Sequence, residues 1–180
     1  MSSTRARPRH RRPKLVEVPV EAGPGEVLLW TDGACRRNPG PGGWAAILVH
    51  GLGEAVELSG GHPSTTNNRM EYTAALEGLN ALPAWSRVCI VTDSRLMLDS
   101  MTKWIHGWKR RGWTTAAGEP VKNQDLVMAL ETAIARHEVV RWHWVRGHET
   151  GAEHAHKALN DRADRLAVAA SHAAAWRVRP

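Results

Sequence analysis

The alternation of apolar and polar positions divides the first part of the chain into strands. Residues 26–34, EVLLWTDGA, form an apolar run that predicts a central strand, and residues 44–50 and 54–60 predict two more strands joined by a tight glycine turn. Residues 36–43, RRNPGPGG, have the composition of a turn. The chain is therefore expected to open with an antiparallel meander.

Helical periodicity begins at Asn68, and Pro83 ends it. Residues 87–93 predict a second buried strand, and Ser94 is placed to cap a helix over residues 94–101. A helix around residues 123–136, an alternating strand at 138–145 and an Ala-rich helix from about 158 to 173 follow. This order predicts an α/β fold, a five-stranded mixed sheet with helices packed on it and sites at the carboxyl ends of strands.

Length and charge limit the possible functions. A chain of 180 residues suits one domain, and without a long apolar run or an apolar segment behind the basic N-terminal residues, we expect neither a membrane span nor a secretory signal. The net charge of +6 arises in residues 1–14, which hold six Arg or Lys and no acid, since the rest holds eighteen residues of each sign. We expect residues 1–25 to be a basic, disordered extension, either a solubilising segment or a salt-sensitive tether to nucleic acid.

The chain has two cysteines, Cys35 and Cys89, and because we expect no export, we expect no disulfide and a reducing, cytoplasmic location.

Both predicted buried strands end in a Thr-Asp pair followed by a small residue. Asp32 lies in Thr-Asp-Gly and Asp93 in Thr-Asp-Ser, so both are expected at the rim of the sheet, where they would repel each other unless a cation lay between them. Glu71, in the first turn of a helix, and Asp161 or Asp164, in the last helix, are further candidates. A single acid is more often a surface charge or a cap, but this set offers the oxygen ligands that Mg²⁺ prefers.

Several segments, in order, resemble the motifs of type 1 ribonuclease H (ribonuclease HI): WTDGACRRNPGPGGWAAIL, TTNNRMEYTAALEGL, VTDS, WIHGWKRRGWTTAAGEPVKNQDL, and WVRGH followed by NDRADRLA. The resemblance implies an RNase H-like fold over residues 26–173, with a short tail at 174–180 and a basic, Trp-rich protrusion. It also implies Mg²⁺-dependent hydrolysis of the RNA strand of an RNA/DNA hybrid, which leaves 3′-hydroxyl and 5′-phosphate ends. Two Mg²⁺ ions would be bound with the substrate, Mn²⁺ is a possible substitute, and a monomer is expected.

The same resemblance assigns roles to individual residues. The metal-binding catalytic carboxylates would be Asp32, Glu71, Asp93 and Asp164, where Asp164 is preferred to Asp161 because it lies four residues after an asparagine, as in the family. His148 matches the mobile histidine that helps to protonate the leaving group or to free the product.

Substrate contacts follow from the resemblance as well. Minor-groove contacts would come from Cys35 and the backbone near Arg37, and from Asn38, Asn67 and Asn68. Thr66 and Asn123 match a pocket that holds a DNA-strand phosphate. The DNA-strand channel would be lined by Trp104, Trp108, Lys109, Arg110 and Arg111.

Two positions depart from the family pattern. Ser64 stands where a basic residue often supports the phosphate pocket, and the loop at residues 149–157 is longer than in compact bacterial relatives.

Alternative interpretations remain at this stage. The fold could serve a non-catalytic hybrid-binding protein, or a transposase or integrase core, although these recombinases lack the NNRME helix followed by a basic protrusion.

Trp113 could belong to the core of a helical hairpin rather than to a binding surface. The glycine-rich residues 38–43 could suggest a phosphate loop, but a hairpin turn is the better interpretation. His148, His154 and His156 could suggest zinc, but their spacing is irregular, so the last two are interpreted as solvent-facing.

Overall fold

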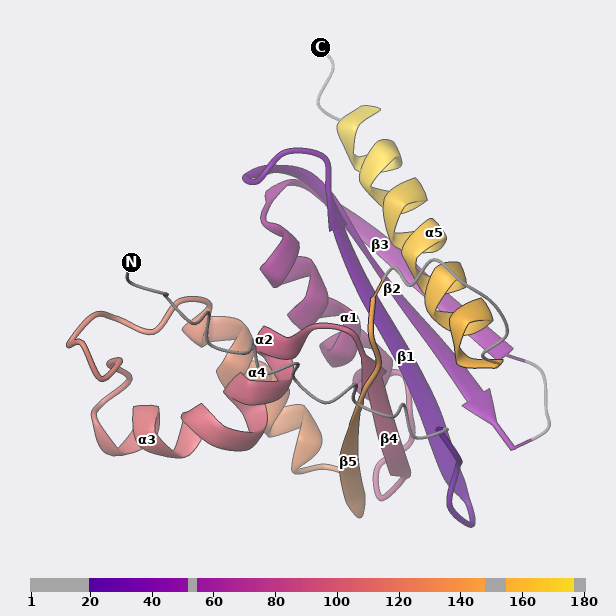
Figure 1. Cartoon of the computed structure of the whole chain (residues 1–180), viewed down its shortest axis with the longest axis horizontal. Coiled ribbons are helices and arrows are strands. Elements are labelled where there is room, and N and C mark those ends of the chain that lie inside the picture. The colour runs from indigo at the N-terminus through magenta and orange to yellow at the C-terminus, as the bar shows by residue number, and fades with distance from the viewer. Residues whose placement is uncertain (1–19, 52–54, 148–154, 177–180) are drawn as a thin grey trace, which may run out of the picture.

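The computed structural model describes residues 20–51, 55–147 and 155–176. They include a five-stranded sheet in the order β3-β2-β1-β4-β5 (Figure 1). Its strands are β1 (Glu26–Cys35), β2 (Gly40–His50), β3 (Ala55–Thr65), β4 (Arg87–Thr92) and β5 (Val139–Trp144). β1, β2 and β3 pair antiparallel, whereas β4 pairs parallel with both β1 and β5. The mixed sheet predicted from the sequence is confirmed.

Helices cover both faces of this sheet. α5 (Ala155–Trp176) lies on one face, and α1 (Asn67–Asn80) lies on the other with α4 (Gln124–Ile134) against it (Figure 1). Alternate residues of each strand point to opposite faces. Accordingly, Leu29 and Ile90 belong to the core under α1, and Trp30 and Val91 belong to the core under α5.

The protrusion begins directly after β4. α2 (Arg95–Asp99) runs through a π-helical turn, Ser100–Trp104, into α3 (Ile105–Arg110), which stands away from the sheet in Figure 1. The Ser94 hydroxyl accepts a hydrogen bond from the Met97 backbone nitrogen at 3.4 Å, as expected of a helix cap. Trp108 and Trp113 pack against the core, while 43% of Trp104 is exposed.

The glycine-rich segment differs from the prediction. Residues 40–43 are not turn residues but the first part of β2, where Gly42 pairs with Cys35 of β1. A β-carbon on Gly43 would collide with the backbone of α5 at Ala167 and Ser171. Glycine in a strand marks a close backbone approach, so Gly43 allows α5 to pack closely on the sheet.

The start of the domain also differs from the expected boundary. Val20 is buried in the core under α5, and the Glu21 carbonyl accepts a hydrogen bond from Arg141 at 2.5 Å. Residues 20–25, expected to belong to a disordered extension, therefore contact the folded domain. Within the described ranges, no helix has the length and apolar character needed to cross a bilayer.

Candidate active site

Asp32 and Asp93 come together because β1 and β4 run parallel. Thr31 pairs with Thr92, so the residues that follow them in the sequence lie side by side at the carboxyl end of the sheet. The Trp144 indole nitrogen donates a hydrogen bond to the Asp93 carbonyl at 3.1 Å, which ties the end of β4 to that of β5. The two Thr-Asp pairs therefore occupy equivalent positions on neighbouring parallel strands.

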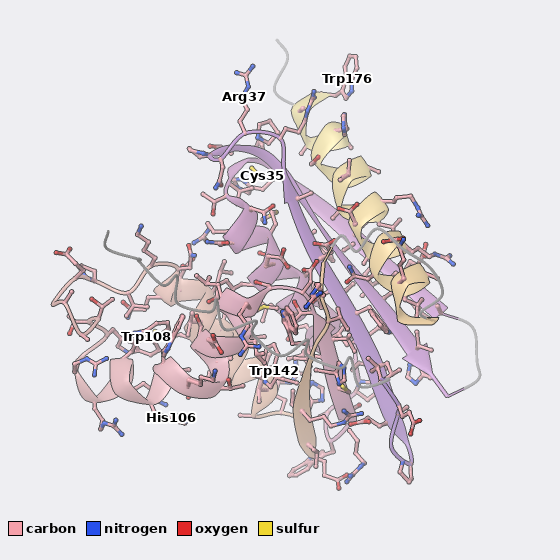
Figure 2. All side chains as sticks on the ribbon, in the orientation of Figure 1. Cys35, Arg37, His106, Trp108, Trp142 and Trp176 are labelled. Carbon is pink, nitrogen blue, oxygen red and sulfur yellow. The ribbon has the colours of Figure 1, made fainter. Side chains whose placement is uncertain are left out.

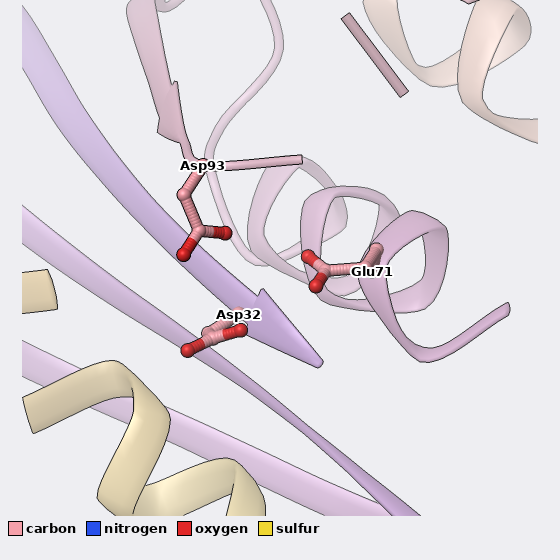
Figure 3. Close-up of side chains that lie close together, drawn as sticks. All are labelled: Asp32, Glu71 and Asp93. Carbon is pink, nitrogen blue, oxygen red and sulfur yellow. The ribbon is translucent and has the colours of Figure 1, made fainter. Parts of the chain in front are cut away.

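Glu71 reaches the same point from α1. The Thr66 hydroxyl caps this helix by accepting from the Arg69 backbone nitrogen at 3.3 Å. One carboxylate oxygen from each of Asp32, Glu71 and Asp93 lies within 4.8 Å of the others. Figure 3 shows the three carboxylates pointing toward one another from β1, from the end of β4 and from α1.

The fourth predicted carboxylate, Asp164 of α5, lines the same cavity of about 450 Å³. Asp161, the alternative candidate, does not line it. The cavity thus brings together carboxylates from β1, α1, the end of β4 and α5.

Burial and repulsion from neighbouring carboxylates make Asp32 and Glu71 weaker acids than usual. Burial, followed by the charge of Asp93, raises the pKa of Asp32 to about 8, although the Gly33 backbone nitrogen donates to its carboxylate at 2.7 Å. Burial and the charges of Asp32 and Asp93 raise the pKa of Glu71 well above its usual value. Without a cation, the cluster therefore holds protons near neutral pH.

The donor set fits a hard divalent cation. Glu71 Oε2 is buried and has no hydrogen-bond partner among the described residues, so a carboxylate oxygen is left for another ligand. In octahedral Mg²⁺ coordination at about 2.1 Å, ligand oxygens lie roughly 3–4 Å apart. The spacing of the carboxylate cluster is compatible with such a site after small side-chain movements.

Most of the predicted minor-groove residues surround this cavity. Cys35, Asn67 and Asn68 line it, and the Asn38 carboxamide accepts a hydrogen bond from the Asn67 backbone nitrogen at 3.1 Å. Figure 2 shows Arg37 extending away from the turn that follows Cys35. Both cysteines are free, and Cys89 is buried in the sheet, where burial raises its thiol pKa to about 11.

The residues predicted to hold a DNA-strand phosphate are connected through Arg69. Its guanidinium donates to the Asn123 carboxamide at 3.5 Å and forms a bidentate pair with Asp125 at 3.0 and 2.7 Å. Thr66 caps the same helix turn. Ser64 is exposed on β3, where its backbone nitrogen donates to the His62 ring at 3.1 Å.

The protrusion presents its basic residues to solvent. Lys109, Arg110 and Arg111 are exposed, and Lys109 pairs with Glu131 of α4 at 2.7 Å. The Trp104 and Trp108 rings lie 5.9 Å apart between centroids, tilted by 51°. Because Trp108 and Trp113 also pack against the core, Trp104 is the most accessible of these indoles.

Several residues of the predicted histidine loop lie outside the residues that the structure describes. His148 and His154 lie outside the described residues, as do residues 149–153, and the side chain of His156 is likewise not described. Their predicted roles stay predictions.

Sequence reasoning missed Arg95. It lines the cavity together with Ser94 and Leu96. Its position just after a strand-terminal carboxylate was a signal that could have found it, but the direction of its side chain was not readable from the sequence.

Comparisons with known proteins found a matching family model and proteins of similar sequence and structure. The family model described as RNase H matches residues 24–172. The chain is similar to the ribonuclease H of Erythrobacter litoralis, with 54% identity over 146 residues, covering 81% of this chain and 96% of the relative. Its structure is similar to that of LC9-RNase H1, a type 1 RNase H with the type 2 active-site motif, at 32% identity and a TM-score of 0.69, covering 87% of this chain and 75% of that chain.

LC11-RNase H1 in complex with an RNA/DNA hybrid has the same fold. It is 22% identical, with a TM-score of 0.58, and the match covers 82% of this chain and 98% of that chain.

Proposed function

The chain belongs to the ribonuclease H family, and we propose that its acidic cavity hydrolyses the RNA strand of RNA/DNA hybrids with two divalent cations, leaving 3′-hydroxyl and 5′-phosphate ends. The observation that supports this proposal most directly is the convergence of Asp32, Glu71 and Asp93 within 4.8 Å. Such a cluster is costly to bury unless it serves a cation.

Asp32, Glu71, Asp93 and Asp164 would hold Mg²⁺, or Mn²⁺ in its place, during the reaction. The bound ions would activate a water molecule and stabilise the leaving oxygen. In the in-line displacement, the water oxygen forms a bond to phosphorus while the bond between phosphorus and the 3′-oxygen breaks. The 3′-oxygen leaves as a hydroxyl, for which His148 is proposed as the proton donor.

The surrounding residues would select and orient the hybrid. Asn67 and Asn68 line the cavity and carry amide groups that can both donate and accept hydrogen bonds, which suits recognition of 2′-hydroxyl groups in a minor groove. The DNA strand would be held by Thr66 and Asn123 and by the basic residues of the protrusion. We propose that the protein acts as a cytoplasmic monomer.

A non-catalytic hybrid-binding protein with this fold is the alternative. The four carboxylates favour catalysis, because a protein that only binds a polyanion gains nothing from buried negative charge at its binding surface. The family match likewise disfavours a transposase or integrase core.

The test is a cleavage assay on four substrates of one sequence: RNA/DNA, RNA/RNA, DNA/DNA, and a DNA duplex with a single ribonucleotide, each with Mg²⁺ and with Mn²⁺. We expect cleavage of the RNA strand in the hybrid, products that accept ligation at the 5′-phosphate, and no cleavage in EDTA. Binding of the hybrid without any cleavage would instead support the non-catalytic alternative.

A further inference from the structure

Arg95 is a cation at the edge of a cavity lined by carboxyl groups. The described residues that line the cavity include four carboxylates, Asp32, Glu71, Asp93 and Asp164, and Arg95 is the only basic residue among them. A phosphodiester entering this cavity is repelled by those carboxylates that are ionised and attracted by this guanidinium. Arg95 is therefore placed to attract the phosphate backbone of a substrate in the cavity.

Two contacts hold the guanidinium in place. Its central carbon lies 5.6 Å from the centre of the Trp144 ring, and its Nε lies 3.4 Å from the Asp99 carboxylate one helical turn away. Trp144 also donates to the Asp93 carbonyl. One indole therefore contacts both the backbone of a proposed metal ligand and the side chain of Arg95, which fixes the guanidinium relative to the carboxylates.

The charge of Arg95 is not neutralised by these contacts. Asp99 also pairs with Lys103 at 2.7 Å, so two cations share one carboxylate. The terminal Nη nitrogens of Arg95 form no hydrogen bond with any residue that the structure describes, and the side chain is 56% exposed. A guanidinium has donors and no acceptors, and its planar ends match the oxygens of a phosphate.

We propose that Arg95 is a substrate-positioning residue that binds an RNA-strand phosphate next to the scissile phosphodiester. This inference rests on the proposed function, because that function places the RNA strand in the cavity. A phosphate held at Arg95, on the β4 side of the cavity, fixes the strand one linkage away from the carboxylates that act on it. The guanidinium also offsets part of the repulsion between the carboxylates and the backbone of the substrate.

The first test compares Arg95→Gln and Arg95→Lys with Arg87→Gln as a matched control. Arg87 lies at the opposite end of β4 and pairs with Glu138 at 2.7 Å on the surface, so its loss removes the same charge far from the cavity. We expect Arg95→Gln to raise KM about tenfold, with kcat changed less than about threefold, and to lower the dependence of log Kd on log salt by about one. Arg95→Lys should recover part of the affinity, and Arg87→Gln should behave as the wild type.

The second test locates the phosphate. Single methylphosphonate linkages, which remove the charge of one phosphate, are placed at successive positions around the cleavage site of the RNA strand. We expect one of them to weaken binding to the wild type in Ca²⁺ and to have no further effect on Arg95→Gln. If 2′-deoxy substitution shows this loss of sensitivity instead, Arg95 contacts a hydroxyl and the phosphate assignment is wrong.

The outcomes separate this inference from the proposed function. A wild-type protein that fails to cleave the hybrid overturns the proposed function. A wild type that cleaves, together with an Arg95→Gln variant of unchanged KM and salt dependence, overturns only the role of Arg95. A lowered melting temperature with an unchanged salt dependence would show that Arg95 merely supports Trp144 and Asp99, and would also overturn the inference.

Discussion

The backbone nitrogen of Glu71 lies 2.5 Å from the point that a β-carbon on Gly33 would occupy. Gly33 follows Asp32 in β1, so the absence of its side chain allows α1 to approach the strand closely enough for Glu71 to meet Asp32. The carboxylate cluster depends on this contact between a strand and a helix.

We therefore expect Gly33→Ala to displace α1 and to separate Glu71 from Asp32. Overpacking of this kind destabilises a fold by about 1–3 kcal/mol, and a displacement of about 1 Å in a catalytic site lowers the rate by about 100-fold. Steady-state cleavage and thermal unfolding would measure both effects. Gly23→Ala is the matched control, because a β-carbon at Gly23 would meet only ordinary van der Waals contacts. Gly118→Ala is unsuitable as a control, because Gly118 has a positive φ that alanine rarely adopts. Unchanged kcat in Gly33→Ala would contradict the proposed dependence.

Asp32→Asn should abolish cleavage while leaving binding of the hybrid largely intact. The amide keeps the shape of the side chain but removes the charge needed at the proposed cation site, so we expect a loss of at least about 1000-fold in kcat. Mg²⁺ titration by calorimetry should lose its signal in the same variant, and anisotropy of a labelled hybrid would report binding. Normal cleavage by Asp32→Asn would remove the proposed site.

The raised pKa values predict how pH affects the metal-free protein. The pKa of Asp32 is about 8 in the fold, whereas the pKa of an aspartate in the unfolded chain is 3.8, so between these values the native state holds a proton that the unfolded state has lost. The stabilising effect of this protonation is complete below about pH 4 and is lost as pH rises to about 8. The raised pKa of Glu71 acts in the same direction.

In EDTA, the melting temperature should therefore fall between about pH 5 and pH 8, and Mg²⁺ should reverse the fall. Asp32→Asn removes the titrating group, so it should be more stable than the wild type at pH 8 by roughly 2–8 °C. Thermal unfolding followed by circular dichroism would measure this. A melting temperature that rises with pH in EDTA would contradict the expected sign.

The protrusion should contribute affinity through charge. Replacing Lys109, Arg110 and Arg111 together with Ala should weaken hybrid binding and lower the slope of log Kd against log salt by about two to three, because each basic residue that contacts a phosphate contributes about one. Arg136→Ala, which removes a hydrogen bond to Asn80 away from the cavity, is a control for surface charge. An unchanged slope in the triple variant would exclude phosphate contacts by the protrusion.

The basic N-terminal segment should add affinity that does not depend on the active site. Val20 and Glu21 contact the domain, so the informative deletion removes only residues 1–14. We expect weaker hybrid binding and a flatter salt dependence, with the Mg²⁺ requirement unchanged. If affinity and slope stay the same, the segment is a solubilising extension.

The sequence by itself determined much of this protein. Apolar periodicity predicted the strands and helices, and the Thr-Asp pairs toward the carboxyl ends of two predicted buried strands identified Asp32 and Asp93, because a carboxylate near the carboxyl end of a strand lies at the sheet rim in an α/β arrangement. These are local properties that neighbouring residues fix. Residues 40–43 were misread for the same reason, since local composition indicates a turn, whereas they open β2 and Gly43 allows the close approach of α5.

Only the tertiary structure decided which of these groups meet. The parallel pairing of β1 with β4 brings Asp32 beside Asp93, the close approach of α1 at Gly33 adds Glu71, and the packing of α5 adds Asp164. The stacking of Arg95 on Trp144 links residues from two elements that are far apart in sequence. Such contacts depend on packing between distant segments, and their electrostatic consequences, such as the raised pKa of Asp32, arise only when burial removes water from the assembled cluster.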